Sequence, residues 1–522
     1  MNKNKQTKKK GKDSGLDTIL GIFTLVVLCV FPVVYDNYYF NILQTKYKFF
    51  SASAIVMFVL AFGYGLFSGK LIEVLKKKQI KSLLKTLNIV DWSLLVFWFA
   101  HVVSWINCEW PWEAFWGTSG RFNGVFLMTV YLIVYFVITR CFKMKRVYLD
   151  AFLAVSIFVC GFGITDYFQM DLLGFKEMML ETQKGDYTST IGNINTYTVY
   201  VGAVLCVSMI LFVLETCKKR TMFYFGVMAV SMVALIVGTS DNAYLTLAAL
   251  FGLSPLYLFR KKTWTRRYVA SIATLLTAIL FVGWINRAYA DTVFELNSIF
   301  KILIDLSIIP VVTAGLWGVV LVWMYLAGRS RKSGKEELGK GFVYAWMAVI
   351  GIVVFGVLYV LYDANIAGNA DKYHAIKNYV VYDDSWGTNR GYVWSRSFTL
   401  YKETFTPIQK LFGYGADTFK LLMMENYTPL HGYVYDSAHN EYLHFLITIG
   451  FVGASSYVVM LLSSAVMMAK KMKGRPEVAA CLFVVLAYAI QALVNINLPV
   501  VFPLIWQLLA MGLSKTEEQV EK

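Results

Sequence analysis

The sequence predicts an all-α fold: a polytopic transmembrane helix bundle of about 12–14 spans with one large extracytoplasmic loop. Three observations lead to this prediction. The 522-residue chain is 57% hydrophobic and only 16% charged, a composition typical of polytopic membrane proteins. Apolar runs of roughly 20 residues, the length that crosses a bilayer core, recur along the whole chain. Basic residues gather in every second connection between these runs.

Fourteen apolar runs qualify as candidate spans. The first follows a Lys-rich stretch, as in a signal peptide, but it has no convincing small-residue cleavage site and many spans follow it. We therefore expect a retained first helix. The last two runs are joined by a tight turn at 495–499, so thirteen spans is an alternative. The runs are 17–35, 47–68, 89–107, 122–139, 147–168, 194–216, 221–239, 242–259, 268–286, 302–327, 342–362, 441–469, 477–495 and 499–514.

The charge pattern predicts the orientation of the chain. In a soluble protein a net charge of +16 would suggest nucleic acid, but here 35 of the 49 Lys and Arg residues fall in alternate connections. That alternation is the positive-inside bias, so we expect no nucleic-acid partner and a multi-pass protein of the cytoplasmic membrane. Both termini should be cytoplasmic and residues 363–440 external. This loop is nearly neutral, with 7 basic and 8 acidic residues.

The predicted parts of the chain follow from the runs and the charges. A stretch with helical spacing at 69–88 should lie on the inner leaflet. The seven cysteines are dispersed without metal-ligand spacing, so we expect no disulfide framework, no zinc and no cofactor. The parts are a cytoplasmic tail (1–16), membrane helices 1–11 (17–362), the large loop with its catalytic elements (363–440), C-terminal membrane helices (441–514) and a second cytoplasmic tail (515–522).

The large loop is the segment most suited to chemistry. At 78 residues it is far longer than a connector needs to be, and long structured loops usually carry function. Its nine Tyr and two Trp residues suit the stacking of sugar rings, and they suit an interfacial aromatic belt equally well. We expect it to form a cap on the membrane domain.

His439 is the candidate general base, because it lies where this loop meets a span and can reach both a lipid head group and an aqueous acceptor. His101 and His444 lie in apolar runs and are expected to be structural. Arg121, Arg390 and Arg396 are rare basic residues on the predicted outer side. A guanidinium binds phosphate oxygens bidentately, although a snorkelling role is an equal alternative for Arg396.

Several motifs in the loop resemble the O-antigen ligase and O-antigen polymerase (Wzy-type) superfamily. His439-Asn440 is followed after nine residues by Gly450 and then by Gly453. Upstream, the stretch from Arg390 to Trp394 is similar to the family's Arg-x-x-x-Trp element. Leu411-Phe412-Gly413-Tyr414-Gly415 is similar to its Leu-x-Gly-x-Gly element.

The resemblance implies a membrane-embedded inverting glycosyltransferase that needs no metal. The donor would be an undecaprenyl-diphosphate-linked glycan, moved en bloc to a glycan or lipid acceptor on the outer face. His439 and Arg390 would be catalytic. Arg121, Arg396, Asn440, Gly413 and Gly415 would bind substrate, although a tight turn is the better reading of the two glycines alone.

Two comparisons with the family pattern leave the roles of the arginines open. Family members often have Ser-Arg-Gly where this chain has Ser240-Asp241-Asn242, so the role of that Arg is absent or passes to Arg121, Arg287 or Arg396. The Arg-x-x-x-Leu pattern also fits Arg396 to Leu400. Spacing to Gly413 favours Arg390 as the essential loop arginine.

Two functional questions stay open at the level of sequence. A polymerase extends the glycan on its carrier and a ligase moves it elsewhere; we lean towards a polymerase. A lipid-linked glycan flippase or other transporter is the alternative from another class. It is suggested by carboxylates in or near spans, among which Asp305 is expected to be the most buried: Asp91, Asp150, Asp166 and Asp305.

Overall fold

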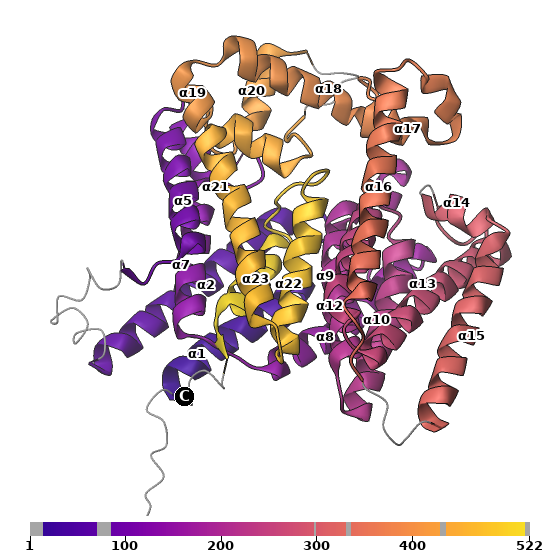
Figure 1. Ribbon diagram of the computed structural model, residues 1–522. Helices are drawn as coiled ribbons and strands as arrows, with labels where there is room; N and C mark the ends of the chain where they lie inside the picture. Colours follow the sequence, from indigo (N-terminus) through magenta and orange to yellow (C-terminus); the bar gives the residue numbers. More distant parts are fainter. Residues whose placement is uncertain are drawn as a thin grey trace, which may run out of the picture.

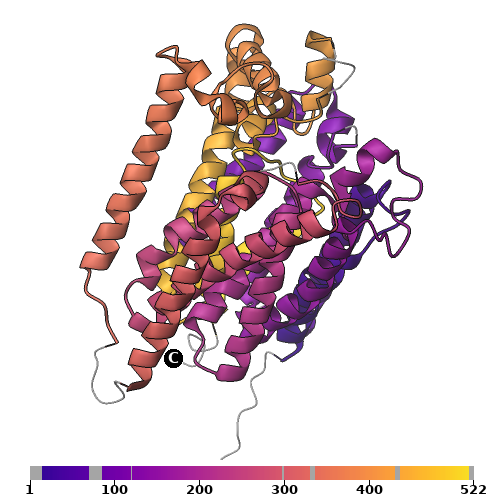
Figure 2. The ribbon, with the colours of Figure 1, turned by 90° about the vertical axis from the view of Figure 1, so that its right-hand side faces the viewer.

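The computed structural model describes residues 14–69, 85–118, 120–296, 299–329, 336–428 and 435–516. Figure 1 and Figure 2 show a bundle of long helices with a layer of shorter helices across one end. The predicted all-α bundle is therefore confirmed. The first thirteen residues of the N-terminal tail, most of the expected inner-leaflet stretch at 69–88, and His431 lie outside the described residues.

The N-terminal half contains most of the membrane helices. Its elements are α1 (Ser14–Leu25), η1 (Val26–Val30), η2 (Phe31–Val33), α2 (Ile42–Phe67), α5 (Ile89–Ile106), α6 (Pro111–Trp116), α7 (Val125–Cys141), β1 (Lys143–Met144), α8 (Arg146–Tyr167), η3 (Glu181–Asp186), β2 (Tyr187–Thr188), β3 (Gly192–Asn193), α9 (Ile194–Leu214), α10 (Lys218–Val237), α11 (Asn242–Leu253), α12 (Pro255–Leu258) and α13 (Lys262–Ala288).

The C-terminal half adds the cap and the remaining membrane helices. Its elements are α14 (Ile299–Asp305), α15 (Ile308–Arg329), α16 (Gly341–Asn365), η4 (Ala370–Ile376), α17 (Lys377–Val380), α18 (Trp386–Thr399), η5 (Leu400–Thr404), α19 (Pro407–Phe412), α20 (Phe419–Asn426), α21 (Glu441–Lys471), α22 (Pro476–Gln491), α23 (Phe502–Leu513) and β4 (Lys515–Thr516).

The helices agree with the fourteen apolar runs of the sequence. Ten helical segments among the described residues are long and apolar enough to cross a bilayer, and four more are apolar but shorter. The last two runs form separate helices, α22 and α23. The run at 302–327 is interrupted between α14 and α15, and Asp305 lies exposed at that break. The expectation that Asp305 is the most buried span carboxylate was therefore wrong.

The other carboxylates that suggested a transporter have local partners. Asp91 accepts hydrogen bonds from Tyr135 and Arg140, and it belongs to the capping box that starts α5. Asp166 accepts from the backbone N–H of Ser189 at 2.6 Å. Asp150 accepts from the hydroxyl of Tyr224 at 2.5 Å. These contacts explain the carboxylates as parts of helix packing.

The centre and the edge of the bundle differ in burial. Every residue of α9 from Thr196 to Leu214 is buried, as expected for a helix that is apolar on all faces. In contrast, no residue of α16 before Asp363 is buried, and little of α15 is. Figure 1 shows α15 at the edge of the molecule, and Figure 2 shows α16 at the edge in the turned view. In a bilayer their exposed apolar side chains would face lipid.

The large loop forms the cap. Helices α17 to α20 lie across one end of the bundle (Figure 1). The cap has a small apolar core that includes Val393, Phe419 and Leu422, and this core continues into Leu443 and Ile447 of α21. The loop therefore packs directly on the helix that follows it, as expected for a cap.

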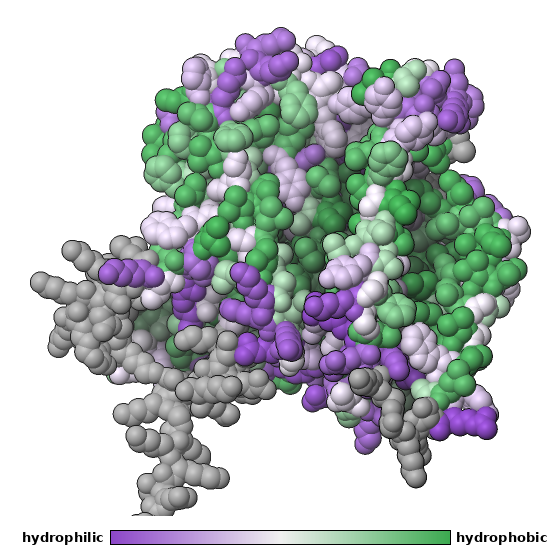
Figure 3. Space-filling view, in the orientation of Figure 1, coloured by the Kyte–Doolittle hydropathy of each residue, from purple (hydrophilic) through white to green (hydrophobic). Residues whose placement is uncertain are grey.

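The described chain begins and ends at the opposite end of the bundle. Asp17 in α1 forms an ion pair with Lys143 in β1 at 3.0 Å. Strand β1 pairs in parallel with β4, which follows the last helix. Figure 3 shows hydrophilic side chains gathered along this end, below a largely apolar wall. Both ends of the described chain thus lie on one side and the cap on the other.

Candidate active site

His439 lies at the start of α21, at the junction of cap and bundle. The side-chain oxygen of Asn440 accepts the backbone N–H of Leu443 at 3.0 Å and so caps the helix. His439 has φ +46°, a left-handed conformation that is uncommon for a non-glycine residue. Such backbone strain persists where the surroundings enforce it, often at functional sites.

Arg390 reaches this junction from α18. Residues Thr388 and Asn389, just before it, are also left-handed, with φ of +60° and +66°. One turn further along α18, the indole N–H of Trp394 donates to the carbonyl of Ala438 at 2.8 Å. This bond holds α18 against the segment that carries His439.

Arg121 comes from the opposite direction, from the turn before α7. Its Nη2 donates to Oδ1 of Asp436 at 2.6 Å. Its backbone N–H and that of Asn123 donate to Oδ2 of Asp417, at 2.8 and 2.9 Å. The side chain of Asn123 donates to the carbonyl of Asn497, between α22 and α23, at 2.6 Å. The 121–123 turn therefore joins the cap to the C-terminal helices.

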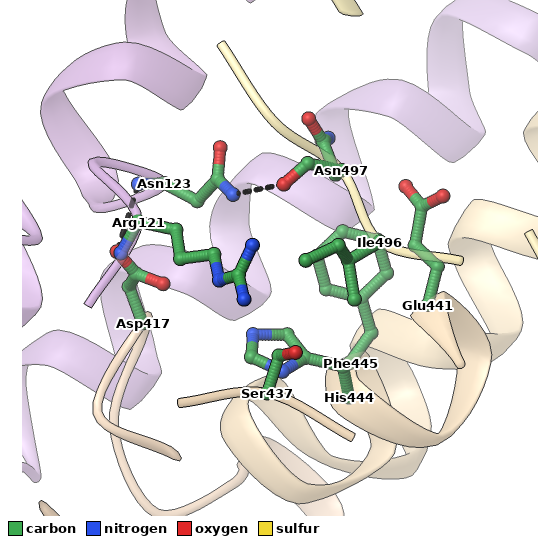
Figure 4. Close-up of a pocket in the computed structure, with 9 residues that line it drawn as sticks. All are labelled: Arg121, Asn123, Asp417, Ser437, Glu441, His444, Phe445, Ile496 and Asn497. Carbon is green, nitrogen blue, oxygen red and sulfur yellow. Dashed lines mark hydrogen bonds between the residues drawn. The ribbon is translucent and has the colours of Figure 1, made fainter. Parts of the chain in front are cut away.

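These segments enclose a small polar pocket, shown in Figure 4. Its volume is about 10 Å³, room for one water, one hydroxyl or one phosphate oxygen. The guanidinium of Arg121 and the ring of His444 face one another across it in Figure 4. Its lining residues are Arg121, Asn123, Asp417, Ser437, Glu441, His444, Phe445, Ile496 and Asn497.

Five buried polar atoms around this pocket form no hydrogen bond with the described residues. Buried polar atoms nearly always have a partner, because an unpaired one costs about 1–3 kcal/mol. A group of such atoms around one pocket is therefore a place where a bound polar molecule would complete the hydrogen bonding. They are Arg121 Nε, Asn123 Oδ1, Ser437 Oγ, His444 Nδ1 and Asn497 Oδ1.

The electrostatics of the junction follow from burial and from the two guanidinium groups. Burial, with the positive charges of Arg121 and Arg390, lowers the pKa of His439 to about 3. The imidazole is therefore neutral near pH 7 and can accept a proton. Arg121 holds the pKa of Asp436 below its usual value despite burial. Burial raises the pKa of Asp417 to about 7, although two backbone N–H groups oppose the shift.

Asp241 stands where the family often has arginine. The hydroxyl of Tyr379, in the cap, donates to the Asp241 carboxylate at 3.3 Å. Burial raises the pKa of Asp241, and the nearby charge of Arg390 lowers it in part. The hairpin before α11 therefore offers Arg390 a counter-charge in place of a further guanidinium.

The other two arginines named from the sequence, Arg396 and Arg287, do not join this group around His439. Arg396 lies over the ring of Tyr392, at 4.7 Å from its centroid, and 3.8 Å from Asp384. Arg287 is exposed at the end of α13. The structure therefore brings Arg390 and Arg121 close to His439, whereas Arg396 has its own partners in the cap.

Gly413 and Gly415 lie against the backbone of α21. The N–H groups of Tyr414 and Gly415 donate to the carbonyls of Ile447 and Thr448, at 3.0 and 3.1 Å. A Cβ on Gly413 would lie 2.2 Å from the Thr448 backbone. These contacts assign the glycines a packing role, in agreement with the tight-turn reading. Their role in substrate binding, like that of Asn440, stays a prediction.

Sequence reasoning missed the acidic residues around the pocket. Glu441 is buried and accepts hydrogen bonds from the hydroxyls of Tyr457 and Tyr488, both at 2.8 Å. Asp417 follows the Leu-x-Gly-x-Gly element by two residues, and Asp436 precedes His439 by three. That proximity to the motifs was the available signal. His444, expected to be structural, also lines the pocket.

No cluster of three or more His, Cys, Asp and Glu side chains that could hold a metal ion occurs among the residues that the structure describes. The groups available to bind a substrate are thus the two guanidinium groups, the imidazole and the polar atoms of the pocket. This set can bind an anion and accept a proton from a hydroxyl.

Comparison with known proteins gives a family match for part of the chain. A family model described as O-antigen ligase matches residues 298–458, which include α15, α16, the cap and the first part of α21. No curated protein matches the chain. The matched region contains His439, Arg390, Arg396, Gly413 and Gly450. The match supports a membrane glycosyltransferase-type ligase or polymerase. The match over residues 298–458 thus supports the resemblance to the O-antigen ligase and O-antigen polymerase superfamily that the motifs had indicated.

Proposed function

We propose that this protein is an inverting glycosyltransferase that moves a glycan from undecaprenyl diphosphate to an acceptor hydroxyl at the outer face of the cytoplasmic membrane, without a metal ion. The observation that carries the proposal is the meeting of Arg121, Arg390 and a neutral His439 beside a pocket with unpaired polar atoms. The O-antigen ligase match over the same region supports it.

The chemistry follows from the charges. The acceptor hydroxyl gives its proton to His439, its oxygen attacks the anomeric carbon, and the bond from that carbon to the diphosphate oxygen breaks. Undecaprenyl diphosphate leaves with one more negative charge. Arg121 and Arg390 offset that charge where it develops, which is the preorganised electrostatic stabilisation that lowers such barriers.

Donor binding would also activate the base. In the free protein the two guanidinium charges help to hold the pKa of His439 at about 3, which makes it a weak proton acceptor. A diphosphate between them would offset their charge and raise this pKa. The imidazole then becomes basic only when the leaving group is in place. This coupling would keep the lipid-linked glycan from reacting until its diphosphate is bound between the two arginines.

Within this class we favour a polymerase of a surface polysaccharide, with a ligase as the alternative. The test uses purified protein in proteoliposomes with an undecaprenyl-diphosphate repeat unit, with and without EDTA. Longer glycans on the same lipid, equally in both samples, are the expected result. Glycan on another lipid or on a protein acceptor would identify a ligase. Product formed only from a nucleotide sugar, or lipid translocation without a product, would contradict the proposal.

A further inference from the structure

A second, larger cavity lies at the end of the bundle opposite the cap. Its volume is about 1220 Å³, and it is enclosed by the ends of several helices together with the turns that join them. We call it the basal cavity. Its charged lining is strongly unbalanced, because two acidic residues, Glu215 and Glu337, face six basic ones. The basic residues are Arg146, Arg260, Lys261, Lys340, Lys473 and Arg475.

Three helices begin at this cavity: α13, α16 and α22. The residue before each helix is basic: Lys261, Lys340 and Arg475. Lys and Arg side chains have no acceptor, so none of the three can cap the first turn of its helix. A helix N-terminus carries partial positive charge, and Ser, Thr, Asp and Asn are the side chains that stabilise it. A basic residue at all three positions therefore adds positive charge to the helix N-termini. Glu477, in the first turn of α22, offsets it at that helix, and α13 and α16 have no acidic residue in the first turn, so a bound anion would be stabilising there.

Arg146 provides a further unsatisfied group in the cavity wall. It lies 3.5 Å from Glu215 and 4.0 Å from Glu477. Its Nη1 atom is nevertheless buried and forms no hydrogen bond with the described residues. A guanidinium N–H in this position is ready to donate to an oxygen of a bound anion.

The start of α16 is held at the cavity by the backbone. The N–H of Lys262 donates to the carbonyl of Glu336 at 2.9 Å, and that of Leu338 to Arg260 at 2.8 Å. The side chains of Arg260 and Lys261 lie over the rings of Tyr257 and Trp264, at 5.4 and 4.7 Å. Backbone hydrogen bonds between residues 260–262 and 336–338 therefore hold Arg260 and Lys261 at the wall of the cavity.

The positive-inside bias explains why basic residues lie at this end of the bundle, but it requires only that they lie in the connections. It does not require that they stand at three helix starts around one cavity. An anion explains that placement, because helix N-termini and guanidinium groups together bind phosphate oxygens. The cavity also has Tyr257, Trp264 and Tyr344 in its lining, so a ligand with an apolar part fits it.

We propose that the basal cavity binds a phosphate-bearing ligand, either the head group of an anionic lipid or a soluble phosphate compound. This site is separate from the candidate active site, which lies beneath the cap. It does not depend on the proposed transferase activity. Since α16 runs from this cavity to the cap, the site lies at one end of the helix whose other end leads into the catalytic loop (Figure 1).

The test measures thermal melting of the full-length protein in a neutral detergent. One arm titrates phosphatidylglycerol against phosphatidylcholine. The other arm titrates inorganic phosphate and ADP against chloride at constant ionic strength. The pocket variant is Arg260→Gln/Lys340→Gln. The matched control is Lys218→Gln/Lys219→Gln, which removes the same charge from exposed residues at the start of α10, outside the cavity. A single Lys473→Gln variant repeats the test in the α21–α22 turn.

In the wild type and the control, one of the two arms should raise the melting temperature. In the pocket variant, and less strongly in Lys473→Gln, the affinity from that arm should fall about tenfold, because charge-assisted contacts are lost. A response to phosphatidylglycerol alone identifies a lipid, and one to phosphate or ADP alone identifies a soluble ligand. No response of the wild type in either arm, or equal affinities in pocket and control variants, would overturn the proposal.

Discussion

At the scale of single residues, the defining feature is a neutral imidazole between two positive charges. Arg121 and Arg390 stand close enough to His439 to lower its pKa, and both have an acidic partner of their own, Asp436 and Asp241. Each guanidinium thus has a carboxylate nearby before the donor binds. A diphosphate must compete with these carboxylates, which favours a doubly charged ligand over a singly charged one.

The pH dependence should reveal this arrangement. Only the neutral ring accepts a proton, so activity is lost as pH falls through the pKa of His439. In the free protein that pKa is about 3, and bound diphosphate should raise it. We therefore expect the acid limb of kcat to lie at higher pH than that of kcat/KM. Initial rates at varied donor concentration between pH 4 and 8 should show the acid limb of kcat, whereas kcat/KM should stay level down to about pH 4. Coincident limbs near pH 6.5 would contradict the account.

Arg390 should matter through its shape as well as its charge. Arg390→Lys keeps the charge but loses the bidentate fork. We expect a loss of about 2–4 kcal/mol in transition-state stabilisation, measured as kcat/KM for glycan transfer. Arg396→Lys is the matched control in the same helix. Because Arg396 lies over Tyr392 in the cap, its replacement should have a smaller effect. A larger loss in Arg396→Lys would exchange the roles of the two arginines.

At the scale of elements, the site depends on one close crossing of two backbones. Helix α21 is kinked at Gly450, which has φ +72°, and Gly413 lies against the kink with φ +82°. A Cβ on Gly450 would lie 2.3 Å from the backbone of Leu411. The two glycines of the family motifs therefore allow the cap and α21 to meet.

Gly413→Ala should disrupt this crossing. Its Cβ would overlap the Thr448 backbone in a conformation that alanine rarely adopts, so we expect a loss of several kcal/mol in stability, and of activity with it. Gly351→Ala in α16 is the control, because a Cβ there has no atom within 4 Å. Thermal melting and transfer rates are measured in parallel. A Gly413→Ala protein as stable as Gly351→Ala would show that the crossing is not required.

The elements themselves were largely predictable from the sequence. Each apolar run corresponds to helix because a membrane span must satisfy its own backbone hydrogen bonds. The interruption between α14 and α15 was not predicted, since both sides of the break are apolar. The helical content of the cap was not predicted either, because its short helices depend on packing against α21.

The site was predictable only where a motif marked it. His439 and Arg390 were predicted from their place on the outer side and from their motifs, and their catalytic roles stay predictions. Asp417 was missed because its role depends on Arg121 and Asn123, almost three hundred residues earlier in the chain. Asn440 was expected to bind substrate, and its position as a helix cap emerges only from the backbone geometry of α21. Such pairings cannot be read from spacing in one sequence.

At the scale of the whole molecule, the cap and the basic end lie at opposite ends of an apolar bundle (Figure 3). This arrangement predicts that the cap is external. In a Cys-free background, Thr388→Cys should react with an impermeant thiol reagent in intact cells. Lys218→Cys should react only after permeabilisation. The reverse pattern would contradict the predicted orientation and move the proposed transfer to the inner face.

The central claim is that glycan transfer takes place where His439 meets the two arginines. The measurement that tests it most directly is transfer from a purified undecaprenyl-diphosphate glycan by His439→Ala, with His374→Ala, an exposed cap residue, as the control. If the imidazole is the general base, turnover should fall by about 10²–10⁴-fold in His439→Ala, while melting temperature and expression stay near those of the wild type. A well-folded His439→Ala protein with normal turnover would contradict the account.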